Sequence, residues 1–345
     1  MLTIFLVFLL ALILALFLTP PVRRLAIRLG ALDRPVSRSV HTHPIPRLGG
    51  LAMVGAFLLP LVLTQGFADE TVRGVVAGTL VLVVLGWLDD TRGLKPGVKF
   101  LGQTLAAVLL VALGTSIDWV TDPWHGGMFF LGAWGYPLTV FWVVAIINVV
   151  NLIDGLDGLA AGISAIAATT LMVVAWQQGQ ALAAVMAAGL AGSALGFLRY
   201  NFNPARIFMG DTGSMFLGFV LAAISVDGAL KSTAALALAV PVLALGLPIF
   251  DTFFAIVRRY LNGQPIYLPD KGHLHHRLLD LGLTQRQAVL VMYSIAALLG
   301  LSAVLITRTN LTQSLAFLFT LTGSLLIGAK KVGVLEVHQG HAIKK

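Results

Sequence analysis

The sequence contains no cysteine among its 345 residues. This absence excludes disulfide bonds, cysteine-ligated zinc, iron–sulfur clusters and thiol nucleophiles, so any bound metal must be held by oxygen or imidazole ligands. Charged residues are also scarce, at 11%, whereas 58% of the residues are hydrophobic and the mean hydropathy is +0.91. Such a chain has too little polar surface for a water-soluble domain.

Apolar runs recur along the whole chain, each long enough to cross about 30 Å of hydrocarbon as a helix. They are apolar on every side rather than alternating in polarity, which favours helices over barrel strands. We therefore expect one all-α, polytopic integral membrane domain over residues 1–345 with about 11 transmembrane helices. The expected spans are Leu2–Thr19, Leu48–Gln65, Val72–Leu88, Val98–Ile117, Phe129–Val150, Leu159–Trp176, Ala181–Leu198, Gly213–Leu230, Ala234–Ile256, Ala288–Thr307 and Thr312–Gly328. Small residues in the seventh span, including Gly189, Gly192 and Gly196, predict close helix packing.

The distribution of lysine and arginine indicates the orientation, because basic residues near helix ends are retained in the cytoplasm. Alternate connecting segments hold 20 of the 23 basic residues, and the other set holds only Arg73, Lys231 and Arg308. This split predicts a protein of the cell (inner) membrane with the N-terminus outside and the C-terminus in the cytoplasm. Orientation and anionic lipids then account for the net charge of +8 without a nucleic-acid partner.

The unusual polar residues gather on the same cytoplasmic face. They lie in five loops, residues 23–47, 89–98, 148–158, 199–213 and 257–287. Ionisable groups at membrane depth are costly, so they are functional candidates by default.

The first candidate is the pair Asp89 and Asp90, which ends the third span. The C-terminal end of a helix disfavours negative charge, so two carboxylates there are unexpected for a plain solvated helix end. Two adjacent oxygen ligands suit Mg²⁺, or Mg²⁺ bound to phosphate.

Four polar residues recur every three positions where the fifth span ends: Asn148, Asn151, Asp154 and Asp157. An unbroken helix would splay the first and last of them apart. Gly155 and Gly158 can open the helix, so that we expect all four side chains to converge on one cavity. The competing interpretation is a polar seam between packed helices.

Asp211 lies in the motif GDTGS at the start of the eighth span. An ordinary helix cap would look the same in sequence. The functional interpretation is that Gly210 and Gly213 let the backbone approach a phosphate while Asp211 holds its metal.

Histidines cluster in the longest cytoplasmic loop, where His273, His275 and His276 lie near Lys271 and Arg277. Their spacing does not suit zinc, and imidazoles beside Lys and Arg are better explained as donors to phosphate oxygens. Two more histidines, His41 and His43, precede the turn PIPRLGG. Taken singly, each of these histidines is better explained as an ordinary loop residue.

Five motifs together carry a resemblance over almost the whole chain: PIPRLGG, Asp89–Asp90, NxxNxxDGxDGL, GDTGS and HxHH, in this order. They resemble the polyprenyl-phosphate N-acetylhexosamine-1-phosphate transferases (glycosyltransferase 4 family), in particular the bacterial undecaprenyl-phosphate GlcNAc-1-phosphate transferases. The resemblance implies transfer of GlcNAc-1-phosphate from UDP-GlcNAc to undecaprenyl phosphate with release of UMP, as the first membrane step towards a cell-envelope polysaccharide. It also implies Mg²⁺, for which Mn²⁺ could substitute. A homodimer is compatible with it.

The motifs and the resemblance together give one set of expected site residues. The expected metal ligands are Asp89, Asp90 and Asp211, and the expected catalytic residues are these three with Asp154 and Asp157. The expected substrate-binding residues are Asn148, Asn151, His41, Arg47, Arg206, Lys271, His273, His275, His276 and Arg277.

Two alternatives remain open. The related phospho-MurNAc-pentapeptide transferases carry three histidines followed by an acid, whereas this loop reads HLHHR with Arg277, which favours the smaller sugar. An ion-coupled transporter would also use buried Asp and Asn, but near the midplane and within repeated halves. No repeat is evident, and the clusters lie at one interface.

Overall fold

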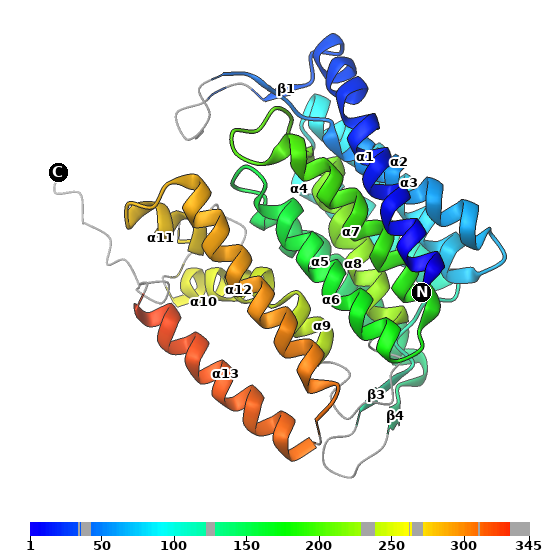
Figure 1. Ribbon diagram of the computed structural model, residues 1–345, viewed down its shortest axis with the longest axis vertical. Coiled ribbons are helices and arrows are strands. Elements are labelled where there is room, and N and C mark those ends of the chain that lie inside the picture. Colours follow the sequence, from blue (N-terminus) through cyan, green and yellow to red (C-terminus); the bar gives the residue numbers. More distant parts are fainter. Residues whose placement is uncertain are drawn as a thin grey trace.

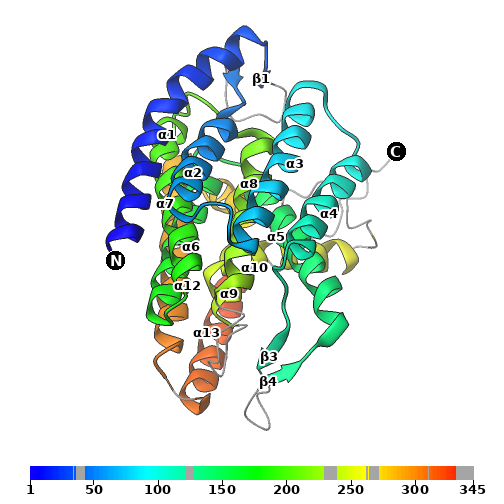
Figure 2. The same cartoon turned by 90° about the vertical axis from the view of Figure 1, so that its right-hand side faces the viewer.

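In a computed structural model the chain forms a bundle in which most long helices lie with their axes roughly along one line, running up and down in turn (Figures 1 and 2). The structure describes residues 1–33, 35, 43–121, 128–228, 239–261, 263, 272–309 and 311–331. The first half contains α1 (Leu2–Arg28), β1 (Leu32–Asp33), β2 (Ile45–Pro46), α2 (Gly49–Gln65), α3 (Glu70–Arg92), α4 (Pro96–Ala112), β3 (Trp119–Thr121), β4 (Met128–Phe130) and α5 (Gly135–Ile153). The second half contains α6 (Leu159–Gln177), α7 (Ala181–Asn201), α8 (Gly210–Asp227), α9 (Ala239–Ala244), α10 (Gly246–Leu261), α11 (Leu274–Asp280), α12 (Gln285–Ile306) and α13 (Leu311–Lys331).

The length and composition of the helices identify an all-α polytopic membrane protein. Among the described residues, six helices are long and apolar enough to cross a membrane: Leu2–Arg28, Glu70–Arg92, Gly132–Ile153, Leu159–Gln177, Ala181–Asn201 and Gln285–Ile306. Shorter apolar helices form at α2, α4 and within α13. Two small antiparallel sheets, β1 with β2 and β3 with β4, are the β structure within the described ranges.

Three expected spans are shortened by several residues or divided in the observed structure. The fourth, Val98–Ile117, is shorter than expected, because α4 ends at Ala112. The ninth, Ala234–Ile256, is divided in its described part into α9 and α10, because Pro248 has no N–H to donate to the carbonyl of Ala244. The helix α10 then lies across the direction of the bundle (Figures 1 and 2). The fifth span was expected to begin at Phe129, which instead lies in strand β4.

The polar connections gather at one end of the bundle. The β1–β2 ribbon, the α3–α4 turn and the α5–α6 and α7–α8 connections lie at the end shown uppermost in Figure 1, whereas β3 and β4 lie at the other. The sequence motifs are therefore on one side of the apolar bundle, as their alternation with the spans predicts.

The central helix is α8. Every residue from Thr212 to Val226 is buried, and the helix contacts α2, α3, α5, α6 and α7. Its first turn, which carries Asp211, is consequently enclosed by several other helices.

The helices α1 and α7 pack with their backbones in close contact. A Cβ atom at Gly192 or Gly196 would clash with the backbone carbonyl of Phe8 or Leu12 on α1. Small residues allow such approach where lipid provides no hydrophobic driving force between helices. The prediction that glycines in this span serve helix packing is confirmed.

We expect Gly192→Ala to destabilise the protein by about 1–3 kcal/mol, because the added methyl group overpacks the α1–α7 contact. The measurement is thermal unfolding in detergent. The matched control is Gly323→Ala in α13, where a Cβ meets no atom within 4 Å. Equal unfolding temperatures for the two variants would contradict this account of the contact.

Candidate active site

Two aspartates from different helices face each other across a lysine. Asp89 lies in the last turn of α3, Asp211 in the first turn of α8 and Lys99 in the first turn of α4. The Lys99 Nζ donates to Oδ2 of Asp89 at 3.1 Å and also to Oδ2 of Asp211. Asn151 Nδ2 donates to the other oxygen of Asp211 at 3.3 Å. Three of the sequence motifs therefore meet at one point, where a single ammonium group lies between two carboxylates.

Asp90 follows Asp89 in sequence but points elsewhere, and its side chain is completely buried. Its carboxylate accepts hydrogen bonds from the backbone N–H groups of Asp211 at 2.9 Å and Thr212 at 3.2 Å, and from Thr212 Oγ1 at 2.8 Å. Arg47 donates from Nε at 3.2 Å and from Nη2 at 3.0 Å. Asp90 on α3 thus occupies the N-terminus of α8, where free N–H groups and the helix dipole favour negative charge.

The cap interpretation of Asp211 is wrong. The cap position of α8 is Met209, which makes no side-chain cap hydrogen bond, and Asp211 lies inside the first turn. The carboxylate that satisfies the helix N-terminus comes from Asp90 instead.

The motif glycines make room for protein backbone. Gly210 has a φ of +68°, and a Cβ there would lie 2.5 Å from the Asp90 carboxylate and 2.7 Å from the Arg47 carbonyl oxygen. A Cβ at Gly213 would lie 3.0 Å from the Cα of Gly50 at the start of α2. Gly213 was expected to let the backbone approach a phosphate, but its open side is filled by α2.

The four polar residues at the end of α5 do not converge on one cavity. The helix ends at Ile153, in agreement with the glycines that follow. Asn151 reaches Asp211, but Asn148 Nδ2 donates to Gln103 Oε1 of α4 at 2.7 Å. The residues that contact Asp157 are in the α7–α8 connection, where Ala205 N and Asn203 Nδ2 donate to it at 2.9 and 3.0 Å.

Asp154 follows the last turn of α5 and its side chain is exposed. Crowding by the surrounding protein, and then the negative charges of Asp211, Asp90 and Asp157, raise the pKa of its carboxyl group. Solvent still reaches this group, and no hydrogen bond to it is found among the described residues. Asp154 is therefore the carboxylate in this part of the site that is most open to a ligand.

The histidine segment is anchored by Asp251 of α10. His273 Nδ1 and the backbone N–H of Leu274 each bond to the Asp251 carboxylate at 2.8 Å, and both His273 and Asp251 are buried. These contacts fix the start of α11 against α10.

The next histidine packs on the α5–α6 turn. A Cβ at Gly155 would lie 2.7 Å from His275 Nε2, so only glycine leaves room for this ring. Burial, and then the nearby charge of His276, lower the pKa of His275 to about 4, which keeps it neutral at pH 7. His276 and Arg277 remain partly exposed and are the better placed donors to a ligand.

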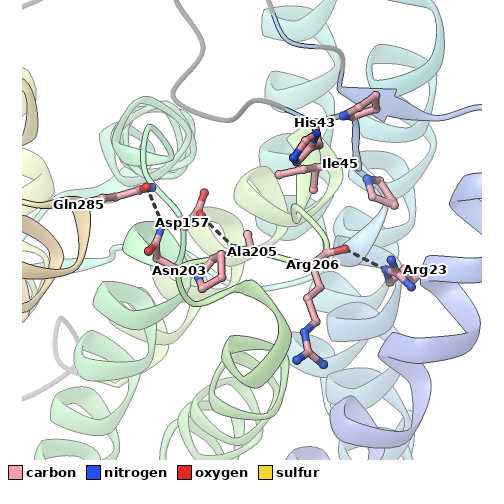
Figure 3. A pocket seen from close by; sticks show the side chains of 11 residues that line it. Arg23, His43, Ile45, Asp157, Asn203, Ala205, Arg206 and Gln285 are labelled. Atoms are coloured by element: carbon pink, nitrogen blue, oxygen red, sulfur yellow. Dashed lines mark hydrogen bonds between the residues drawn. The ribbon is translucent and has the colours of Figure 1, made fainter.

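A cavity of about 400 Å³ opens beside these elements (Figure 3). In Figure 3, Asp157, Asn203 and Ala205 lie at one side, and His43 and Arg23 lie at the other. Its lining also includes Arg206 and Gln285. His41 and Lys271, both expected to bind substrate, lie outside the described residues.

The side chains present allow a limited test of a magnesium site. Among the described residues, no group of three His, Cys, Asp or Glu is arranged as a ready metal site. Mg²⁺ is usually held by one or two carboxylates, with water and substrate phosphates completing its shell. Asp89 and Asp211 fit this pattern. Asp90 already accepts five hydrogen bonds, so its role as a ligand stays a prediction.

Sequence reasoning missed two residues of the site, Lys99 and Asp251. Lys99 was counted only as a basic residue that indicates orientation. Its signal is the short α3–α4 turn, which returns the chain so that a residue ten positions after Asp89 can reach it. Asp251 lies in an apolar segment, and an isolated acid there needs a partner.

Comparison with known proteins is consistent with this geometry. The family model described as Glycosyl transferase family 4 matches residues 72–229. The chain is 42% identical over 336 residues to the probable undecaprenyl-phosphate N-acetylglucosaminyl 1-phosphate transferase of Bacillus subtilis (strain 168), covering 97% of this chain and 94% of that protein. It is 40% identical over 312 residues to the decaprenyl-phosphate N-acetylglucosaminephosphotransferase of Mycobacterium tuberculosis (strain CDC 1551 / Oshkosh), covering 82% of this chain and 77% of that protein. It is 28% identical over 294 residues to the undecaprenyl-phosphate alpha-N-acetylglucosaminyl 1-phosphate transferase of Escherichia coli (strain K12), covering 82% of this chain and 78% of that protein.

We expect Asp90→Asn to lower stability by about 2–4 kcal/mol, because it removes the charge that Arg47 and the N-terminus of α8 both need. The control is Asp89→Asn, which changes the adjacent carboxylate and should cost about 1 kcal/mol. Both are compared by thermal unfolding in detergent. If Asp90→Asn unfolds at the same temperature as Asp89→Asn, the trans-capping role is wrong.

Proposed function

This chain belongs to glycosyl transferase family 4, and we propose that it transfers GlcNAc-1-phosphate from UDP-GlcNAc to undecaprenyl phosphate. The products are undecaprenyl-diphospho-GlcNAc and UMP. The observation that carries the proposal is the meeting of Asp89, Asp211 and Asn151 at one end of the helix bundle. The name of the Bacillus subtilis relative, which aligns over nearly the whole chain, supports this sugar and this carrier.

The proposed membrane arrangement has about 11 spans, the N-terminus outside and the C-terminus in the cytoplasm. It rests on the distribution of 20 of 23 basic residues over alternate segments. The polar connections lie together at one end of the bundle, which supports a site on one membrane face (Figure 1). A cytoplasmic site would receive a water-soluble nucleotide sugar from one side and a lipid phosphate from the adjacent leaflet.

Phosphoryl transfer depends mainly on positioning and on neutralising the charge that develops on phosphate oxygens. Asp89 and Asp211 would hold Mg²⁺, which neutralises pyrophosphate charge when bound and for which Mn²⁺ could substitute. Lys99 lies between these carboxylates and can donate to a phosphate oxygen when they release it. The exposed Asp154 and the partly exposed His276 can contact the reacting groups, whereas the buried His273 and His275 hold the segment in place.

The histidine loop supports the preference for GlcNAc. The position of the carboxylates along the spans argues against a transporter. Arg277 follows the histidines where the pentapeptide-transferring relatives carry an acid, which favours GlcNAc. An ion-coupled transporter would place its carboxylates near the middle of the spans. Here Asp89 and Asp211 lie in terminal helical turns at one end of the bundle.

We expect the purified protein to release UMP from UDP-GlcNAc and undecaprenyl phosphate, and not from UDP-MurNAc-pentapeptide. The measurement is UMP release with a panel of UDP-sugars, with a reaction lacking the lipid phosphate as control. Efficient turnover of the peptide-bearing donor would overturn the sugar assignment. UDP-GlcNAc movement into vesicles without UMP formation would overturn the enzymatic assignment.

We expect Asp211→Asn to lower turnover at least about 100-fold while the unfolding temperature changes little, because Asp90 and not Asp211 satisfies the N-terminus of α8. UMP release is measured over a range of Mg²⁺ concentrations. The matched control is Asp118→Asn, which removes a carboxylate hydrogen-bonded to Ser116 away from the site. Near-normal activity of the Asp211 variant would exclude a role in holding metal.

A further inference from the structure

A second cavity lies next to the first, near the end of α1 that is closest to the site. Its volume is about 270 Å³, and it is lined by Thr19, Pro20, Arg23, Arg24, Tyr200 and Arg206. Half of these residues are arginines, and none is acidic. Among the described residues, no carboxylate forms an ion pair with Arg23, Arg24 or Arg206. Three guanidinium groups with no acidic partner in the described part of the chain make this cavity strongly electropositive.

The walls of the cavity are fixed by hydrogen bonds that involve α1, α7 and the α7–α8 connection. Pro20 has no N–H, so the carbonyl of Leu16 lacks its usual helical donor. The Tyr200 hydroxyl donates to that carbonyl at 3.1 Å. Arg23 Nε donates to the Arg206 carbonyl at 3.0 Å (Figure 3), and the Arg206 N–H donates to the Tyr200 carbonyl at 2.8 Å. The cavity is therefore preformed rather than a chance gap between mobile side chains.

The helix that forms one wall is exposed to lipid along much of its length. Apolar side chains on α1 remain exposed in the bundle, for example Phe17 at 71% and Leu25 at 43%. Arg23 and Arg24 follow the apolar run Leu2–Thr19, so in the proposed orientation their guanidinium groups lie near the cytoplasmic surface of the membrane. The lining of the cavity includes none of Asp89, Asp154 or Asp211, although it shares Arg23 and Arg206 with the first cavity.

We propose that this cavity binds the headgroup phosphate of an anionic phospholipid of the cytoplasmic leaflet. Guanidinium groups bind phosphate oxygens through paired, charge-assisted hydrogen bonds. Basic pockets between transmembrane helices on the cytoplasmic side are suited to such headgroups, because that leaflet is negatively charged. The lipid source is favoured over a soluble phosphate because the cavity adjoins a lipid-exposed helix. The proposal rests on the proposed membrane orientation and not on the transferase reaction.

The experiment compares Arg24→Gln with Arg28→Gln. Each removes one exposed arginine from the end of α1, but only Arg24 lines the cavity. Binding of phosphatidylglycerol and of phosphatidylcholine to the detergent-purified full chain is titrated by native mass spectrometry. We expect the protein to retain one phosphatidylglycerol tightly. Its affinity should fall about fivefold in Arg24→Gln and about 25-fold in the double variant Arg23→Gln with Arg24→Gln. We expect Arg28→Gln to change it by less than about twofold.

Several results would overturn the proposal. If Arg24→Gln and Arg28→Gln weaken phosphatidylglycerol binding equally, the lipid responds to diffuse surface charge and not to a site. If phosphatidylcholine is retained as well as phosphatidylglycerol, the cavity does not require an anionic lipid. Displacement of the lipid by inorganic phosphate at matching concentration would assign a soluble anion, and one-for-one displacement by undecaprenyl phosphate would assign the cavity to the acceptor. UMP release is measured on the same preparations. Intact phosphatidylglycerol binding without UMP release would reject the proposed reaction and leave this site supported.

Discussion

The hydrogen bonds between the Asp90 carboxylate and the N-terminus of α8 are the interaction on which the site depends. A central helix that is enclosed by other helices needs partners for its first N–H groups, because a buried N–H group without a hydrogen bond is costly. Asp90 supplies these partners from α3, and Arg47 balances the charge from the segment before α2. One carboxylate thereby fixes three elements, and Asp89 and Asp211 are placed opposite each other as a result.

The two adjacent aspartates consequently have different roles, Asp90 in stabilising the structure and Asp89 in the open part of the site. Asp90 is enclosed and satisfied, whereas Asp89 shares Lys99 with Asp211 at a partly open position. A buried carboxylate with five donors stabilises the arrangement, and removal of one partner would leave a buried charge uncompensated. A carboxylate with fewer protein donors keeps lone pairs for a ligand. The chemistry of the site therefore depends on a neighbour that does not itself need to contact substrate.

Much of this arrangement could be predicted from the sequence because hydropathy and charge are one-dimensional signals. They located most spans and placed the motifs on one face, and Gly155 and Gly158 correctly indicated a break after α5. The direction of a side chain at a helix end depends on its three-dimensional neighbours, so Asp89 and Asp90 could not be distinguished. For the same reason the sequence could not predict that Asn148 contacts Gln103 instead of facing the cavity. The division of the ninth span follows from Pro248, a signal that was present but was outweighed by continuous hydrophobicity.

The helix geometry also explains why acidic residues are tolerated at the C-terminus of α3. The helix dipole there is unfavourable for both carboxylates. The neighbouring α8 presents its N-terminus to Asp90, and the start of α4 presents Lys99 to Asp89, whose other oxygen accepts the Leu94 N–H at 2.7 Å. A divalent cation would compete with this ammonium group for the same two carboxylates, because a metal held by Asp89 and Asp211 would have to displace Lys99 from between them. Such a site would bind metal weakly alone and more strongly when a diphosphate supplies further oxygen ligands and accepts the displaced ammonium group.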